Sequence, residues 1–379
     1  MTPGAPDLKP SQTGPLGVYL HIPFCRQRCH YCSFNTGPYR PAAMERFLSA
    51  LLSEIDLVGE ARWAGGVSIG TVFFGGGTPS LLEGDEMEAV LNRLRKRFTL
   101  APAAEVTVEC NPESLTRDKA EGCRLAGVNR LSLGVQSLDD DLLARLGRLH
   151  SPVEARRAFN EARAAGFDNL SVDLMYGLPG LDLARWESAV GEILAWRPEH
   201  LSAYALTLDE GSRWASEGVA GLPDEDTVTA QYWALARLAR QTGYEHYEIS
   251  NYARDGFRSR HNQVYWRAEE YLAFGPGACG FLGDVRYGNV KPVERYCAML
   301  EAGSLPLGTH EVLTPGQREA ERRILGLRLT DGVPLPWLKD RRPLIDTWHS
   351  LGLLEIAGGR CRLTEAGFLL SDSLFVHLL

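Results

Sequence analysis

The stretch Tyr19-Leu-His-Ile-Pro-Phe-Cys-Arg-Gln-Arg-Cys-His-Tyr-Cys32 decides how the fold is interpreted. It places Cys25, Cys29 and Cys32 in the spacing Cys-x3-Cys-x2-Cys. A four-iron cluster is normally held by four cysteine thiolates, so three thiolates leave one iron with an open coordination position. A small molecule can bind and be activated at such a position, as it is at catalytic zinc sites. A zinc site remains an alternative, but zinc sites usually join Cys-x2-Cys to a second pair, which this sequence lacks.

The composition is that of a soluble globular protein, because 44% of the 379 residues are hydrophobic and 23% are charged. The net charge of −8 argues against sequence-independent binding to nucleic acid. No stretch approaches the roughly 20 apolar residues that span a bilayer. Residues 1–15 lack an apolar signal core and are predicted to form a disordered tail. The other cysteines are dispersed, which fits a reducing cytoplasm and predicts a cytoplasmic protein.

Short β-branched runs alternate with amphipathic stretches over the first half of the chain. The predicted strands are 17–22, 71–74, 105–109, 130–135, 169–174 and 200–206. The predicted helices between them are 42–58, 85–98, 117–126, 152–165 and 183–196. This alternation predicts parallel strands with right-handed crossovers, either a partial barrel or an open sheet. The cysteine loop directly follows the first strand, at the carboxyl end where parallel α/β folds bind ligands.

The cysteine spacing, with Tyr31 before the last cysteine, resembles that of the radical S-adenosylmethionine (SAM) superfamily. The preceding Tyr-x-His-Ile-Pro-Phe-Cys, which begins at Tyr19, is similar to the group of HemN, the oxygen-independent coproporphyrinogen III oxidase, and its relative HemW. The resemblance implies a partial (β/α)6 barrel over residues 16–208. It also implies a [4Fe-4S] cluster on the three cysteines, with SAM on the open iron. In this superfamily an electron from the cluster cleaves SAM to a 5'-deoxyadenosyl radical.

The resemblance also implies where SAM is bound. A glycine run leaves the backbone free to approach a ligand closely, and Gly76, Gly77 and Thr78 follow the second strand. In the superfamily this segment contacts the amino group of SAM, and an acidic residue after the third strand, here Glu109, is the next contact. A helix cap or a surface acid is the alternative role for Glu109. The predicted SAM-binding set is Tyr19, Tyr31, Gly76, Gly77, Thr78, Glu109, Gln136, Arg148 and Asp173.

Gln136, Arg148 and Asp173 match the HemN residues that contact a second SAM. The sequence leaves open whether one or two SAM molecules bind. HemN has a fourth cysteine two residues after the third, and Phe34 stands at that place here. HemN also has a longer N-terminal extension. Both differences favour the HemW type.

The sequence His261-Asn-Gln-Val-Tyr265-Trp266 matches the His-Asn-x-x-Tyr-Trp motif of HemW, a heme chaperone that hands heme to acceptor proteins. Imidazole is a common heme ligand, and aromatic rings offer flat apolar faces to a macrocycle. His261, Tyr265 and Trp266 are therefore predicted heme contacts. His21 and His30 are alternative ligands. HemW-like chains often have histidine where Cys279 stands, a difference that weakens the match or transfers iron ligation to sulfur.

Residues 209–309 are predicted to form an extension that carries this motif. Residues 310–379 read as helix, helix, hairpin and helix, in the order of a winged helix, and carry nine Lys and Arg against nine Asp and Glu. A balanced charge favours a lid or packing domain over one that binds nucleic acid.

The expected partners are heme, heme-accepting proteins and an electron donor, without nucleic acid. Peripheral membrane association is not visible in the sequence. The alternative function is an enzyme, oxygen-independent coproporphyrinogen III dehydrogenase.

Overall fold

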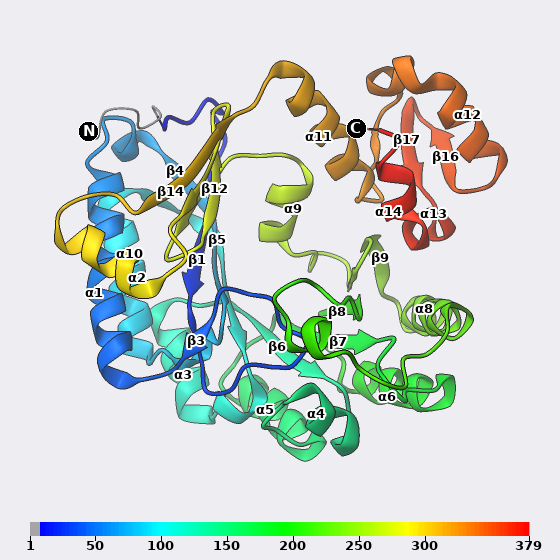
Figure 1. Cartoon of the computed structure of the whole chain (residues 1–379), viewed down its shortest axis with the longest axis horizontal. Coiled ribbons are helices and arrows are strands. Elements are labelled where there is room, and N and C mark those ends of the chain that lie inside the picture. Colours follow the sequence, from blue (N-terminus) through cyan, green and yellow to red (C-terminus); the bar gives the residue numbers. More distant parts are fainter. Residues whose placement is uncertain (1–7, 379) are drawn as a thin grey trace.

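Within residues 8–378, which the computed structural model describes, six parallel strands in chain order form the core and helices cover their outer face (Figure 1). The strands are β1 (Leu16–Ile22), β4 (Ser68–Gly76), β5 (Thr99–Cys110), β6 (Arg130–Gln136), β7 (Leu170–Tyr176) and β8 (His200–Ala205). The crossover helices are α1 (Pro41–Gly59), α2 (Gly84–Arg97), α3 (Arg117–Ala126), α5 (Pro152–Ala164) and α6 (Leu183–Trp196). The predicted partial (β/α)6 barrel is confirmed.

The barrel is open because its first and last strands do not pair with each other in the described sheet. β1 pairs with β4 and with β11 (Tyr271–Phe274), whereas β8 pairs with β7 and with β10 (Asn251–Ala253). The strands are buried on both faces, as is usual for parallel sheets. Their outward residues pack under the helices, and their inward residues line the lumen of the barrel.

The segment predicted as an extension adds strands to both edges of the barrel sheet. Beyond β11 lie β12 (Cys279–Leu282), β13 (Val285–Asn289) and β14 (Leu307–Val312), all antiparallel to their neighbours. Beyond β8 lie β10 and β9 (Glu245–Glu248). The helix α9 (Arg260–Trp266) lies inside the curve of the sheet, and α8 (Glu225–Gln241) lies beside β9 (Figure 1). The sheet is therefore continuous across the predicted boundary at residue 208.

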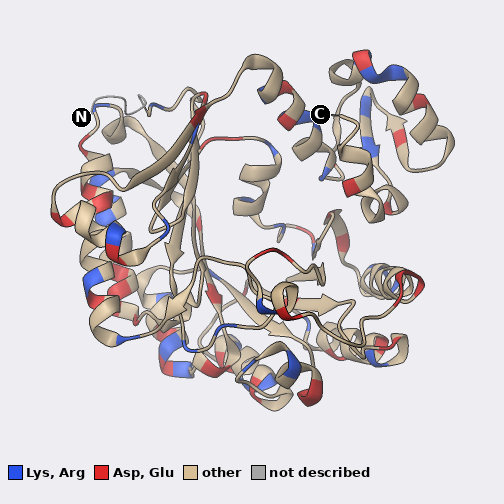
Figure 2. Cartoon of the chain, viewed as in Figure 1, with Lys and Arg blue, Asp and Glu red and all other residues tan. Residues whose placement is uncertain are grey.

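The C-terminal part has its own apolar core, which includes Leu338, Ile345, Trp348, Leu363 and Phe368. Its elements follow the predicted helix, helix, hairpin and helix order. They are α11 (Pro315–Leu327), β15 (Val333–Pro334), α12 (Arg342–Ser350), β16 (Leu354–Ala357), β17 (Arg360–Leu363), α13 (Glu365–Leu369) and α14 (Ser371–Phe375). Figure 2 shows that basic and acidic residues alternate along this part of the chain.

Residues 8–15 differ from the prediction of a disordered tail, whose residues 1–7 lie outside the described part. The carbonyl of Leu8 accepts a hydrogen bond of 2.9 Å from the indole of Trp63. The backbone N–H of Ser11 donates to both carboxylate oxygens of Glu270, at 3.0 and 2.9 Å. These contacts hold the segment on the barrel, although its composition carries no strand or helix signal.

Glu54 fastens the added strands to the barrel. Its carboxylate, buried on α1, accepts hydrogen bonds from the Gly275 N–H (2.8 Å), the Asn289 amide (2.6 Å) and the Tyr296 hydroxyl (2.5 Å). Tyr296 lies on α10 (Val293–Glu301). Burial raises the pKa of Glu54 to about 7, and the three donors partly offset this rise.

We expect Glu54→Ala to lower the free energy of unfolding by about 3 kcal/mol or more, because it leaves several buried donors without an acceptor. Glu45→Ala is the matched control, since Glu45 is exposed on the same helix. Denaturant unfolding measures both variants. Equal stability of the two would contradict this role for Glu54.

Candidate functional site

The three motif cysteines lie in a loop at the carboxyl end of β1. The loop leaves through β2 (Phe24–Cys25) and returns through β3 (Gly37–Pro38), which pairs parallel to β2. Between them the Cys32 N–H donates to the Cys29 carbonyl at 3.2 Å, in a tight turn. The cysteine side chains are half-buried. The loop therefore sits at the edge of the sheet that the sequence predicts.

Two of the cysteine sulfurs accept hydrogen bonds from side chains elsewhere in the barrel. The hydroxyl of Thr78 lies 3.4 Å from the sulfur of Cys25, and Nη1 of Arg148 lies 3.5 Å from the sulfur of Cys29. Burial raises the pKa of Cys25 and of Cys32. Because metals bind the thiolate, loading these cysteines must release protons, which the neighbouring donors and cation favour.

In the described residues, no three His, Cys, Asp or Glu side chains converge as ligands of one metal ion. Zinc requires its ligands to meet at a single point. In a four-iron cluster each thiolate binds a different iron, so the sulfurs stand farther apart. The hydrogen-bond donors at the sulfurs of Cys25 and Cys29 are compatible with a cluster, whose sulfur ligands accept such bonds.

The glycine segment closes directly against the cysteine loop. Gly76 has φ +107°, which L side chains rarely adopt. A Cβ on Gly77 would lie 2.5 Å from the carbonyl oxygen of Phe24. This close approach lets the Gly77 N–H donate to the Ile22 carbonyl at 2.7 Å and the Thr78 N–H to the Phe24 carbonyl at 2.8 Å. The glycines are needed because two backbones touch here.

Two half-buried acids face the floor of the site. Glu109, near the end of β5, accepts a hydrogen bond of 3.2 Å from the Gly76 N–H. Desolvation and the nearby Asp173 raise the pKa of Glu109 to about 8. Asp173 accepts the hydroxyl of Ser132 at 3.0 Å, and desolvation raises its pKa. Two acids close together in a poorly solvated site favour a ligand that brings hydrogen-bond donors or positive charge.

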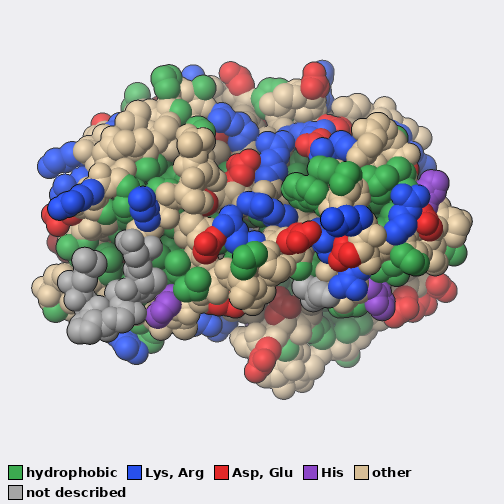
Figure 3. Space-filling view, turned by 90° about the horizontal axis from the view of Figure 1, so that it is seen from above, with side chains coloured by type: hydrophobic (Ala, Val, Ile, Leu, Met, Phe, Trp, Pro, Cys, Tyr) green, Lys and Arg blue, Asp and Glu red, His purple; other side chains and the backbone are tan. Residues whose placement is uncertain are grey.

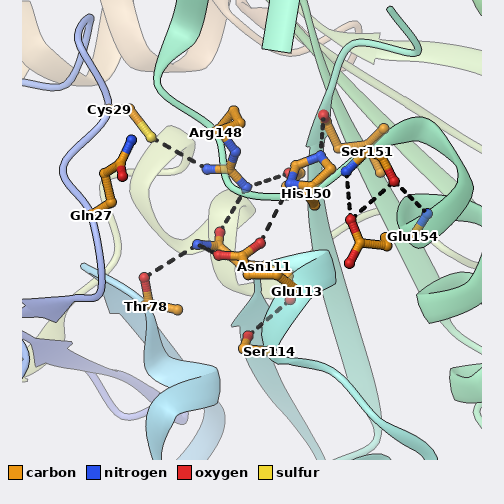
Figure 4. Close-up of polar contacts among 12 residues, drawn as sticks. Gln27, Cys29, Thr78, Asn111, Glu113, Ser114, Arg148, His150, Ser151 and Glu154 are labelled. Atoms are coloured by element: carbon orange, nitrogen blue, oxygen red, sulfur yellow. Dashed lines mark hydrogen bonds and ion pairs between the residues drawn. The ribbon is translucent and has the colours of Figure 1, made fainter. Parts of the chain in front are cut away.

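Gln136 and Arg148 close the side of the site at β6. Gln136 has φ +65°, strained for a residue with a side chain, where the register between β6 and β7 shifts. Nη2 of Arg148 donates to the Gly134 carbonyl at 2.7 Å and to the side-chain oxygen of Asn111 at 2.9 Å (Figure 4). The guanidinium is thus held between the cysteine loop and the strand ends.

These residues surround one cavity of about 390 Å³, a size common for small-molecule sites. All three cysteines line it, and so do the predicted residues Tyr31, Gly76, Gly77, Thr78, Glu109, Gln136, Arg148 and Asp173. Tyr19 is not among the lining residues, and its hydroxyl contacts Nδ1 of His21 at 3.0 Å. The sequence analysis missed the lining residues Gln27, Asn111, Ser132 and Tyr204. Only their places at strand ends or in the loop could have indicated them.

The His-Asn-x-x-Tyr-Trp motif lies on α9, away from this cavity. His261 is 1% exposed, and burial lowers its pKa to about 3, so the ring is neutral. Nδ1 contacts the Thr71 hydroxyl and Nε2 contacts the Tyr265 hydroxyl, both at 2.8 Å. The guanidinium of Arg328 lies 4.1 Å from the ring centre of Trp266. In this conformation His261 has no ring nitrogen left for heme iron.

Tyr265 also lines an open cleft of about 160 Å³ between α9, α11 and the added strands. The cleft is walled by aromatic, basic and acidic residues: Tyr265, Tyr271, Phe281, Arg286, Arg318, Arg322, Glu269 and Glu321. Arg286 is paired with Glu321, and Arg318 is paired with Asp284. Seen from above, this side of the molecule has basic side chains near its middle, beside a hydrophobic patch (Figure 3). The alternative ligand His30 is occupied by the Arg145 carbonyl at 2.9 Å and by Arg213 at 3.2 Å, whereas Cys279 is exposed.

Comparison with known proteins identifies the family of the chain. The family model of the Radical SAM superfamily matches residues 19–193. The chain is 39% identical to "Heme chaperone HemW" of Mycobacterium tuberculosis, over 99% of this chain and 97% of that protein. It is 35% identical to "Heme chaperone HemW" of Bacillus subtilis, over 94% and 97%.

The chain belongs to the HemW family of radical SAM proteins. The solved structure of HemN, coproporphyrinogen III oxidase from Escherichia coli, matches with a TM-score of 0.83 at 23% identity, over 96% of this chain and 90% of that chain. At that identity the match establishes the fold alone. Membership of the superfamily implies a [4Fe-4S] cluster and SAM, and the cavity of this HemW family member fits both. In the part of the chain described, no helix has the length and apolar character needed to cross a membrane.

We expect the affinity of the reconstituted protein for SAM to rise with pH up to about 8, the pKa of Glu109 in the free protein. Below that pH Glu109 is protonated, whereas its carboxylate form is the one that holds SAM best. Binding of SAM then requires Glu109 to lose its proton, which lowers the affinity. Binding titrations between pH 6.5 and 9 measure the slope. Glu109→Gln should bind SAM more weakly and with a shallower slope, because only the titrations of Asp173 and of the SAM amino group remain. An unchanged slope in this variant would contradict the role of Glu109.

Proposed function

We propose that this protein is a heme chaperone that holds a [4Fe-4S] cluster on Cys25, Cys29 and Cys32 and binds SAM in the adjoining cavity. The observation that carries the proposal is the single cavity that joins the three cysteines to the predicted SAM contacts. The names of the similar bacterial proteins supply the heme function. In this proposal heme is cargo, handed to acceptor proteins.

Each part of the cavity has a task in holding SAM. Gly76 and Gly77 allow the backbone to approach the methionine part of SAM, and Glu109 accepts hydrogen bonds from its amino group or ribose hydroxyls. Gln136, Arg148 and Asp173 bind polar groups farther along, of the same SAM or of a second one. Bound together, the cluster and SAM supply radical chemistry, while the protein orients the reactive atoms and excludes water.

Heme is proposed to bind at the cleft beside Tyr265. Aromatic walls suit a flat macrocycle. Arginines suit its carboxylates, once Arg286 and Arg318 exchange their partners Glu321 and Asp284 for them. His261 can ligate iron only after its bond to the Tyr265 hydroxyl breaks. We therefore propose that His261 becomes a heme ligand when the Tyr265 side chain moves away from its Nε2. An electron donor would reach the cluster near Phe34, which lines the cavity and is 62% exposed.

Oxygen-independent coproporphyrinogen III dehydrogenase is the second candidate. The complete SAM cavity favours it, since a simple carrier has no evident need for one. Phe34 in place of the fourth cysteine of HemN disfavours it. The two functions differ in the fate of the porphyrin, which the enzyme converts and the chaperone hands on unchanged.

An anaerobically reconstituted protein should bind heme and show no turnover in a coproporphyrinogen decarboxylation assay. We expect His261→Ala to weaken heme binding about tenfold or more while the cluster is retained. His310→Ala, which removes an exposed histidine on β14, is the control for adventitious binding. Robust turnover without heme uptake would overturn the chaperone proposal in favour of the enzyme.

Tyr265→Phe should bind heme more tightly than the wild type. The variant removes the hydroxyl that occupies Nε2 of His261, so a larger fraction of molecules has a ligand ready. Heme titration with optical detection of the iron ligand field measures the change. Weaker binding by this variant would show that the hydroxyl itself contacts heme and would contradict the proposed movement.

A further inference from the structure

Asn111 is a single side chain that links the hydrogen-bond donors of two cluster cysteines. It follows β5 directly and lines the cavity. Its side-chain oxygen accepts from Nη2 of Arg148 at 2.9 Å, and its Nδ2 lies 3.4 Å from the Thr78 hydroxyl (Figure 4). Arg148 in turn donates to the sulfur of Cys29, and Thr78 donates to the sulfur of Cys25.

The orientation of the Asn111 amide is fixed by its other contacts. Nδ2 also donates to the Glu113 carboxylate at 2.9 Å. A flipped amide would turn its NH₂ toward the guanidinium of Arg148 and its oxygen toward Glu113, and both contacts would be repulsive. The backbone N–H of Asn111 donates to the hydroxyl of Ser80 at 3.2 Å, which holds the residue in place.

Glu113 is itself anchored on the side away from the cysteines. Its second oxygen lies 3.4 Å from Nδ1 of the buried His150, whose Nε2 lies 3.1 Å from the Val135 carbonyl. The network therefore runs from the body of the barrel through Asn111 to two sulfurs. A side chain placed in this way controls where both donors point.

We propose that Asn111 is a positioning residue that holds Thr78 and Arg148 on the cysteine sulfurs and thereby raises the reduction potential of the cluster. The proposal rests on the proposed function, because it requires that the cysteines hold a cluster. Reduction adds one electron, and hydrogen bonds to the sulfurs stabilise the added negative charge. Asn111 acts on the sulfurs through its two neighbours, Thr78 and Arg148.

The test is a redox titration of the anaerobically reconstituted protein, followed by electron paramagnetic resonance. We expect Asn111→Ala to lower the potential by the equivalent of about a tenfold change in the ratio of reduced to oxidised cluster, or about 59 mV for one electron. Asn129→Ala is the matched control. The Asn129 amide bridges the Val106 N–H and the Ala104 carbonyl at the opposite end of the barrel, both at 2.8 Å. The reduction potential of the cluster in this variant should therefore equal that of the wild type.

A double-mutant cycle separates tuning from general damage. In a Thr78→Val background the shift caused by Asn111→Ala should shrink, because one of the two donors that Asn111 positions is already gone. An unchanged potential in Asn111→Ala, an equal shift in Asn129→Ala, or full additivity in the cycle would overturn the proposal.

Asn111→Ser provides a smaller polar variant if Asn111→Ala takes up no iron. Failure of both to hold a cluster that Asn129→Ala accepts would also overturn the proposal, since Asn111 would then be needed for assembly and not for tuning. A wild-type protein without a cluster would contradict the proposed function itself. The two failures are thus distinguishable.

Discussion

The hydrogen bonds between the glycine segment and the cysteine loop are the contacts on which the rest of the site depends. The Gly77 and Thr78 N–H groups donate to carbonyls of the chain leaving β1, at 2.7 and 2.8 Å. They bring the Thr78 hydroxyl to Cys25 and place the end of β4 beside the cysteines. Only glycine permits this approach, because a Cβ on Gly77 would collide with the Phe24 carbonyl. One backbone contact therefore determines both the cluster loop and the cavity floor.

The sequence predicted the six barrel strands because parallel strands buried on both faces are continuous apolar runs. It missed α4 (Asp140–Leu146), which is too short to show helical periodicity. It also placed the start of β5 at 105 instead of Thr99, because exposed residues interrupt the apolar run before Glu105. The added strands β11–β14 were not predicted, since short strands are specified by partners distant in the sequence.

The same limit applies to the functional residues. Most of the predicted site residues line one cavity, because the family resemblance points to residues at strand ends and these ends meet at one edge of the barrel. Asn111 belongs to no motif. Its proposed positioning role rests on its distances to Thr78 and Arg148 and on their distances to the sulfurs of Cys25 and Cys29. His261 matches a motif, yet nothing in that motif indicates that Thr71 and Tyr265 occupy both of its ring nitrogens. A motif indicates which residues are candidate ligands, but it does not indicate whether their ligand atoms are already engaged in hydrogen bonds.

The unclosed barrel has a consequence for association between molecules. Within residues 8–378 the open sheet ends in two strands, β9 and β14, whose outer backbone groups could recruit a strand from another molecule. β9 is covered, because Glu248 forms a bridge with Leu329 in the C-terminal part. β14 carries the exposed polar residues Thr309, His310 and Glu311. Charged or polar side chains along a rim discourage edge-to-edge stacking, so the barrel can stay open without seeding aggregates.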